Sequence, residues 1–203
     1  MKLLRSQTGF TITEIMVVIV ISGFLMAVAA TGFSSFFSKF NEMTKTMELQ
    51  RDAFNCLQTI KNGIPIGSGA GLRFQGIATS DSVLFEGTNA TSGKSIRLYP
   101  PVTDYTHQND FIRIFYEKSS WSVRSTYLYG SIQPPAPLYL FPKNTRGNTM
   151  EVTDLNFKKV NAGAVTKVLE VQLSARVPIR QVHKNKFEYA YVNYATRMTL
   201  NMK

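Results

Sequence analysis

The hydrophobic positions of the chain begin with one long apolar run. Residues 10–38 are 29 residues long and contain a single charged side chain, Glu14. A helix needs about 20 apolar residues to cross a hydrocarbon core about 30 Å thick. A core helix of a soluble protein is rarely apolar on every face over such a length. Residues 10–38 are therefore predicted to form a membrane-spanning helix.

After residue 38 the pattern becomes amphipathic and remains helical. Apolar residues recur mostly at spacings of three and four, which is typical of one helix face. They are Phe33, Phe36, Phe37, Phe40, Met43, Met47, Phe54, Leu57 and Ile60. No proline lies between residues 10 and 62, and Asn62-Gly63 with Pro65 beyond is typical of a helix end. The sequence predicts one helix of 53 residues, from residue 10 to residue 62, whose second half (39–62) packs on a globular head.

The remaining 141 residues, 63–203, have the pattern of a β-rich head. Residues 63–71 are predicted to be a flexible glycine-rich connection. The clearest strand is 169–177, where apolar and polar residues alternate strictly, and 187–200 is its predicted hairpin partner across a basic loop at 178–186. Further strands are predicted at 72–77, 82–86, 95–99, 111–117, 122–129, 137–141 and 152–160. A helix followed by antiparallel strands predicts the α+β fold class.

Composition restricts the chemistry that the chain can perform. The single cysteine, Cys56, excludes an intramolecular disulfide and a four-cysteine zinc site, and its position predicts a core residue on the helix. Cys56, His107 and His183 are too scattered for a zinc site. The loop 104–110 contains carboxylates that would suit calcium as an alternative, but it lacks the EF-hand spacing and is predicted to be a polar surface loop. With no catalytic motif present, we expect no enzyme activity, no bound metal and no cofactor.

The charge of Glu14 stands out because a carboxylate at the centre of a bilayer costs about 2.5–3.5 kcal/mol. One interpretation is that the side chain reaches the membrane interface, where a helix N-terminus favours a negative charge. The other interpretation, which we favour, is that Glu14 forms an ion pair with a cationic group of another chain, because intramembrane carboxylates are usually functional. Lys2 and Arg5 precede the apolar run and predict a cytoplasmic N-terminus. A secretory signal peptide would have a shorter apolar region, although Ala27-Val28-Ala29 formally fits its cleavage site.

The stretch Gly9-Phe10-Thr11-Ile12-Thr13-Glu14-Ile15, between a short basic leader and a long apolar helix, resembles the prepilin signal of the type IV pilin superfamily. That superfamily comprises type IV pilins, type II secretion pseudopilins and competence pseudopilins. The resemblance implies that prepilin peptidase cuts after Gly9, removes the leader 1–9 and methylates the amine of Phe10. Thr13 departs from the usual branched aliphatic residue.

The resemblance also implies a pilin-like fold and a set of partners. The chain would sit in the inner membrane as a single-pass protein with a periplasmic head. It would then join other pilins or pseudopilins, with an assembly platform protein, in a filament in the periplasm or at the cell surface. Glu14 would set the register of the subunit by pairing with the terminal amine of a neighbour, because a buried ion pair specifies register better than it stabilises.

A second resemblance concerns the end of the chain. Residues 152–157, 168–173 and 194–203 are similar to PilW-type minor pilins and to J-type minor pseudopilins of type II secretion. Cys56 alone cannot form the C-terminal disulfide of several major pilins, and Glu14 argues against the K-type tip subunit, which usually lacks that carboxylate. These resemblances imply a structural subunit that helps to prime or cap filament assembly.

The charge of the head supports an alternative function. The chain carries 23 Lys and Arg against 13 Asp and Glu, a net charge of +10. Basic residues interleave with Tyr189, Tyr191 and Tyr194, which would give phosphate contacts and base stacking. The basic residues are Arg176, Arg180, Lys184, Lys186 and Arg197. The alternative is thus a DNA-uptake or adhesive pilin that binds its ligand through the head, unless these tyrosines are ordinary strand residues and the lysines a solvated loop.

Overall fold

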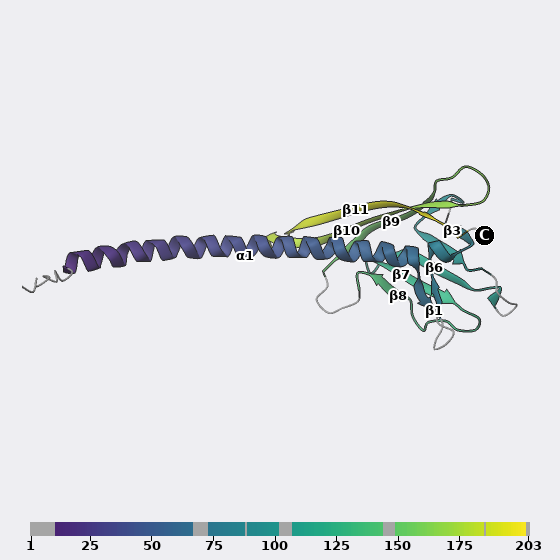
Figure 1. The fold of residues 1–203 in the computed structure, drawn as a ribbon, viewed down its shortest axis with the longest axis horizontal. Coiled ribbons are helices and arrows are strands. Elements are labelled where there is room, and N and C mark those ends of the chain that lie inside the picture. Colours follow the sequence, from purple (N-terminus) through teal and green to yellow (C-terminus); the bar gives the residue numbers. More distant parts are fainter. Residues whose placement is uncertain are drawn as a thin grey trace, which may run out of the picture. The chain divides into compact units, whose positions relative to one another are not determined.

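The computed structural model describes residues 11–66, 73–87, 89–101, 107–143, 149–184 and 186–201. The chain divides into two compact units, with the boundary between Met43 and Thr44. As far as it is described, the first unit is the N-terminal part of one helix, α1 (Ile12–Asn62, 51 residues). The second unit contains the rest of α1 and the strands (Figure 1). The predicted α+β layout, one long N-terminal helix followed by antiparallel sheets, is confirmed.

The described residues of the second unit form three antiparallel sheets. The two-stranded sheet pairs β1 (Ile64–Ile66) with β2 (Arg73–Gln75), which precedes a short 3-10 helix, η2 (Ile77–Thr79). The four-stranded sheet has the spatial order β11 (Lys186–Thr199), β10 (Val168–His183), β9 (Glu151–Lys159) and β4 (Ser92–Gly93). The five-stranded sheet has the order β3 (Ser82–Glu86), β5 (Ser95–Tyr99), β6 (Phe111–Glu117), β7 (Ser122–Leu128) and β8 (Leu138–Phe141).

The alternation of apolar and polar residues predicted most strands closely. β3, β5 and β6 have the predicted bounds, and β7, β8 and β9 differ from the prediction by one residue at one or both ends. Along β10, every second side chain from Leu169 to Val177 is buried, as strict alternation requires. The predicted strand 72–77 was wrong at its last two residues, because β2 ends at Gln75 and Ile77 begins η2.

The predicted basic loop at 178–186 was wrong for residues 178–183, which are strand. β10 continues to His183 and pairs with β11 beyond Pro178, with register shifts near Pro178 and Gln181. Proline is compatible with this position because the pairing of β10 with β9 ends at Arg176. Beyond that residue one edge of β10 is free of β9, and a proline without an N–H is tolerated at such an edge.

The segment 63–71, predicted to be a flexible connection, contains strand β1; residues 67–72 lie outside the described ranges. Gly63 ends the helix with a positive φ of 124°, as the sequence predicted for a helix-ending glycine. A Cβ on Gly63 would lie 2.6 Å from the backbone nitrogen of Gln75, and one on Gly76 would lie 2.6 Å from the nitrogen of Gly63. Two glycines thus let the helix end and β2 approach each other backbone to backbone.

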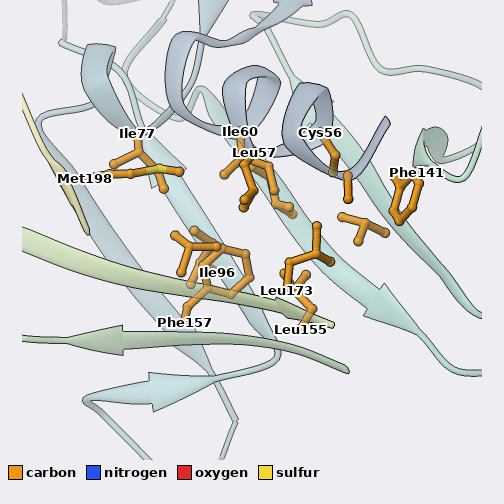
Figure 2. Packing of buried hydrophobic residues seen from close by; sticks show 14 of the residues in the cluster. Cys56, Leu57, Ile60, Ile77, Ile96, Phe141, Leu155, Phe157, Leu173 and Met198 are labelled. Carbon is orange, nitrogen blue, oxygen red and sulfur yellow. The ribbon is translucent and has the colours of Figure 1, made fainter. Parts of the chain in front are cut away.

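The hydrophobic core of the second unit lies between α1 and the inner faces of both large sheets. In Figure 2, Leu57 and Ile60 point from the helix toward Ile96 of β5 and Leu173 of β10. Ile60, Ile96 and Leu173 are completely buried. A fully buried side chain of this size contributes about 1.5–3 kcal/mol to stability. One helix face therefore joins two sheets into a single core.

The helix face that packs on the sheets differs from the predicted one. The buried residues of α1 are Leu49, Ala53, Cys56, Leu57 and Ile60. Met47 and Phe54, predicted on the same face as Leu57 and Ile60, are 60% and 50% exposed. The reason is that a step of three residues falls about 60° short of a full turn. The steps from Phe54 to Leu57 and on to Ile60 therefore move around the helix, from an exposed face to the buried one.

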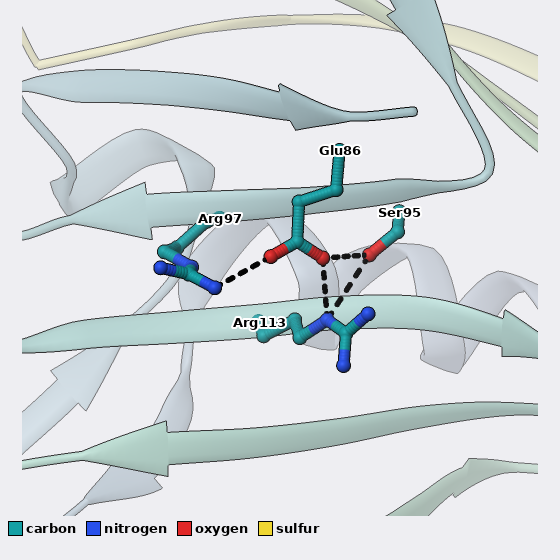
Figure 3. Close-up of polar contacts among 4 residues, drawn as sticks. All are labelled: Glu86, Ser95, Arg97 and Arg113. Carbon is teal, nitrogen blue, oxygen red and sulfur yellow. Dashed lines mark hydrogen bonds and ion pairs between the residues drawn. The ribbon is translucent and has the colours of Figure 1, made fainter. Parts of the chain in front are cut away.

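A cluster of charged residues lies across β3, β5 and β6 (Figure 3). The Glu86 carboxylate accepts hydrogen bonds from Arg97 at 2.7 Å, from the Ser95 hydroxyl at 2.6 Å and from Arg113. Partial burial by itself would raise the pKa of Glu86. The hydrogen bonds from Ser95 and Arg113 and the charges of both arginines outweigh burial, so the pKa of Glu86 is lowered.

We expect Glu86→Gln to destabilise the full-length protein in detergent micelles by about 1–2 kcal/mol at pH 7, because hydrogen bonds to a charged group are worth more than neutral ones. A lowered pKa in the folded state means that this stabilisation is complete above the pKa of an unfolded glutamate, about 4.3. The stabilisation is lost as the pH falls through the pKa of the folded state. Denaturant unfolding at pH 7 and at about pH 3 should therefore show the gap between variant and wild type shrinking. Glu188→Gln, at an exposed carboxylate, is the matched control; an equal loss there would contradict the assignment.

A second prediction concerns Cys56, which is 2% exposed and whose pKa burial raises to about 12. Because only the thiolate reacts readily, the native protein at pH 8 should react with a thiol reagent at least about 100-fold more slowly than the denatured protein. A raised pKa also means that stability linked to this thiol is complete below the unfolded pKa, about 8.5, and declines as the pH rises above it. Rapid labelling of the native chain would contradict the described packing.

Candidate functional site

Of the N-terminal residues that the sequence predicts to be functional, the structure describes only Glu14. Gly9 and Phe10 lie outside the described residues. Thr11 is the first described residue, and α1 begins immediately after it at Ile12. Glu14 is exposed in the first turn of the helix.

Thr11 and Glu14 form a reciprocal cap at the start of α1. The backbone N–H of Glu14 donates to the Thr11 hydroxyl oxygen at 3.3 Å. The Glu14 carboxylate in turn accepts the backbone N–H of Thr11 at 2.9 Å and the Thr11 hydroxyl at 2.9 Å. A threonine followed three residues later by a glutamate is a capping box, which satisfies two of the free N–H groups at a helix start. This sequence signal was present and was missed in the sequence analysis.

The capping box determines where the carboxylate is held. The Glu14 side chain folds back toward the N-terminus of α1, where the partial positive charge of the helix end also favours it. Thr11, whose N–H it accepts, is joined directly to Phe10. The negative charge is therefore held at Thr11, the residue that follows Phe10 in the sequence.

The helix that follows the cap is exposed over nearly all of the described part of the first unit. Residues 11–41 are all exposed, including every large apolar side chain among them. Among the described residues, α1 alone is long and apolar enough to cross a bilayer, judged by length and composition. The apolar N-terminal helix thus fits membrane anchoring.

The arginines suggested as DNA contacts are placed opposite acidic residues in the β9–β10–β11 ladder. Arg176 forms an ion pair with Glu151 at 2.7 Å, and Arg197 forms one with Glu170 at 3.4 Å. Six positions along the ladder separate these two pairs, which is about 20 Å. The sheet therefore does not bring Arg176 and Arg197 to one place.

The other suggested residues lie near the turn between β10 and β11. Arg180 is the cross-strand partner of Glu188, and Lys184 and Lys186 are exposed beside the turn. Within the described part of the chain, neither lysine makes an ion pair.

Aromatic rings surround the Arg176 guanidinium. It lies 4.5 Å from the ring centre of Tyr189 and 5.6 Å from that of Trp121, a residue with an unusual positive φ of 48°. Tyr189 and Tyr191 are neighbours, with ring centres 6.3 Å apart. Arg176, Tyr189 and Tyr191 are thus brought together as the sequence suggested, but the arginine charge is neutralised by Glu151.

In the described ranges, no group of three or more His, Cys, Asp or Glu side chains is placed to hold a metal ion. Residues 104–106 of the loop 104–110 fall outside those ranges. Its last residue, Asp110, is buried and accepts hydrogen bonds from the backbone N–H of Gly130 at 2.6 Å and from His107, whose ring nitrogen lies at 2.7 Å. Its carboxylate therefore serves local structure.

Residues 4–30 match a family model described as the prokaryotic N-terminal methylation motif. No curated protein and no solved structure matches the chain. The matched segment covers the suggested cleavage site, the capping box and residues 10–30 of the predicted membrane helix 10–38. A pilin-type motif indicates a structural protein rather than an enzyme. The chain therefore carries the signal of type IV pilins and pseudopilins, and this motif indicates a type IV pilin-like or pseudopilin precursor.

Proposed function

We propose that this protein is a minor pilin or pseudopilin of a type IV pilus or a type II secretion-type filament, and that it helps to prime or cap filament assembly. In this proposal residues 1–9 are a leader removed by prepilin peptidase, and 10–38 form the membrane and filament-core helix. Residues 39–62 continue that helix onto the head, and 63–203 form the head itself. The minor role rests on the resemblance of the last strands to PilW-type and J-type subunits.

One observation carries the proposal: a carboxylate held, within the methylation motif, at the first turn of a helix whose residues 12–38 are otherwise uncharged and all exposed. A carboxylate there is costly in a bilayer, so its retention calls for a cationic partner. The amine of Phe10, freed by cleavage after Gly9, is such a cation near neutral pH. An amine from a neighbouring subunit would meet Glu14 in a medium of low dielectric constant and fix the stagger between two helices.

The same arrangement supports a location and a set of partners. The basic leader, with Lys2 and Arg5, favours a cytoplasmic N-terminus and a periplasmic head. The exposed apolar side chains of α1 supply the surface for association with other pilin helices as the subunit leaves the inner membrane at the assembly platform. The DNA-uptake or adhesive alternative has weaker support, because Arg176 and Arg197 are already paired with glutamates.

The first test of this proposal is processing. The mature chain purified from membranes should begin at Phe10 and carry one methyl group on its terminal amine, which intact-mass and N-terminal peptide spectra would show. Gly9→Val should leave the full precursor, because the cleavage site is lost, whereas Thr8→Val in the same leader should be processed normally. A mature chain that begins anywhere other than Phe10 would contradict the assignment.

The second test separates the charge of Glu14 from its role as a helix cap. Glu14→Gln keeps the capping box, since glutamine serves at this position, but removes the charge. Thr11→Ala removes half of the cap, at a cost of about 1 kcal/mol, but keeps the charge. If the charge sets the register, Glu14→Gln and Glu14→Leu should both insert in the membrane yet fall at least about tenfold in co-purification with filaments.

The Thr11→Ala variant is the control for this experiment and should enter filaments at nearly the wild-type level. If Glu14→Gln co-purified like wild type while Thr11→Ala did not, capping would be the function of Glu14 and the register proposal would be wrong.

A further inference from the structure

Strand β11 forms one edge of the four-stranded sheet. Over its 14 residues it pairs with β10 on one side. In the described part of the chain, no other strand pairs with its second side, and the backbone of residues 187–198 donates and accepts no hydrogen bond there. In an antiparallel ladder, alternate residues direct N–H and C=O groups away from the paired neighbour. β11 thus offers a row of free backbone donors and acceptors.

The middle of this edge lacks the residues that usually protect one. Residues 189–196 read Tyr-Ala-Tyr-Val-Asn-Tyr-Ala-Thr, with no charge, no proline and no glycine. Proteins normally interrupt an exposed edge with lysine, proline or a bulge, because an open edge recruits other strands. An uncharged, aromatic and β-branched edge of this length is typical of a strand that pairs with a partner.

An exposed apolar strip of α1 lies beside this edge. The Tyr194 hydroxyl of β11 donates to the backbone carbonyl of Gln50 on α1 at 3.5 Å, which places β11 next to that side of the helix. Met47 and Phe54 lie three residues before and four residues after Gln50, so they share its side. They are 60% and 50% exposed. The inward side chains of a strand added to β11 would therefore meet apolar surface.

The charges near β11 indicate the chemistry of such a strand. Lys184 and Lys186 stand exposed at the β10–β11 turn, where β11 begins. Residues 63–203 carry 17 Lys and Arg against 9 Asp and Glu, so two copies of this head repel each other. An acidic partner would complement the positive charge of the turn and of the head as a whole, whereas a second, equally basic copy would not.

On the outer face of the sheet, Tyr189 and Tyr191 provide an aromatic surface that a strand added to β11 would contact. Tyr191 is 61% exposed. Tyr189 is held by the Arg176 guanidinium, which Glu151 fixes from the neighbouring strand β9. Side chains on an added strand would lie directly beside these rings, and aromatic cross-strand pairs stabilise a sheet.

We propose that β11, together with Met47 and Phe54, docks an extended strand from the head of a different, acidic subunit, which pairs antiparallel with β11. Its inward side chains are apolar, and acidic residues at its carboxyl end lie beside Lys184 and Lys186. That the partner is a filament subunit rests on the proposed function; the pairing of a strand with this edge does not.

The test uses unassembled full-length protein in detergent micelles and a labelled synthetic peptide of about ten residues. The peptide alternates valine and threonine and ends in two aspartates. We expect it to bind and to slow amide hydrogen exchange in β11, but not in β4, the opposite edge of the same sheet. A peptide ending in two lysines should bind about fivefold more weakly at low salt. Methylation of alternate backbone nitrogens should weaken binding by more than about tenfold, because it removes the ladder hydrogen bonds.

Two variants locate the site on the protein. Phe54→Gln should weaken peptide binding several-fold, whereas Phe74→Gln, at a phenylalanine of β2 that is 60% exposed, should leave it unchanged. Lys186→Glu should reverse the preference, so that the lysine-ended peptide binds better than the aspartate-ended one.

Several results would overturn the proposal. Equal binding of the methylated peptide would mean that side chains adhere without strand pairing. Slowed amide exchange in β4 instead of β11 would mean that the peptide binds the opposite edge of the sheet. Self-association of the protein through β11, reversed by the peptide, would mean that a second copy of the chain occupies this edge. The peptide assay uses unassembled chains, so its result is independent of the filament experiment on Glu14. Failure of peptide binding would overturn the docking proposal alone, and failure of filament entry would overturn the proposed function alone.

Discussion

The contact on which the head depends is the burial of one face of α1 against two sheets at once. Leu49, Ala53, Cys56, Leu57 and Ile60 form a single apolar cluster with the inner residues of the four-stranded and five-stranded sheets. An antiparallel sheet with one apolar face needs an element to cover it, and here the last turns of the helix cover both. Gly63 and Gly76 hold the end of that helix against β2 by close backbone contact. The register of the helix on the sheets follows from these two constraints.

The opposite end of α1 meets a different requirement. Residues 12–38 of the helix are exposed, and the one charged residue among them, Glu14, caps the helix start. Capping and pairing with a cation use the same carboxylate oxygens, and both favour a negative charge at a helix N-terminus. In the proposed assembly the capping box would keep the side chain in place beforehand, so that less conformational freedom would be lost on forming an ion pair with a neighbour's amine.

The basic residues of the second unit differ in whether acidic residues neutralise them. Arg97 and Arg113 share Glu86, while Arg176 and Arg197 have Glu151 and Glu170, so much of the basic charge is balanced within the sheets. Among the described basic residues, Lys184 and Lys186 lie beside the one long strand edge that carries no charge over its middle. This edge has backbone groups unpaired within the described residues, and such groups would favour a strand over a polyanion as the proposed ligand.

The sequence by itself determined the helix, its end at Gly63, most strand bounds and the methylation motif, because each depends on local periodicity or on a few adjacent residues. It also contained the Thr11–Glu14 capping box. Tertiary structure alone decided which face of α1 is buried, since Phe54 and Leu57 both fit a spacing of three and four and the sheets select between them. Tertiary structure likewise turned the basic segment after Pro178 into strand and paired Arg176 and Arg197 with distant glutamates. Strand order determines which residues become cross-strand neighbours, and strand order depends on contacts between residues far apart in the sequence.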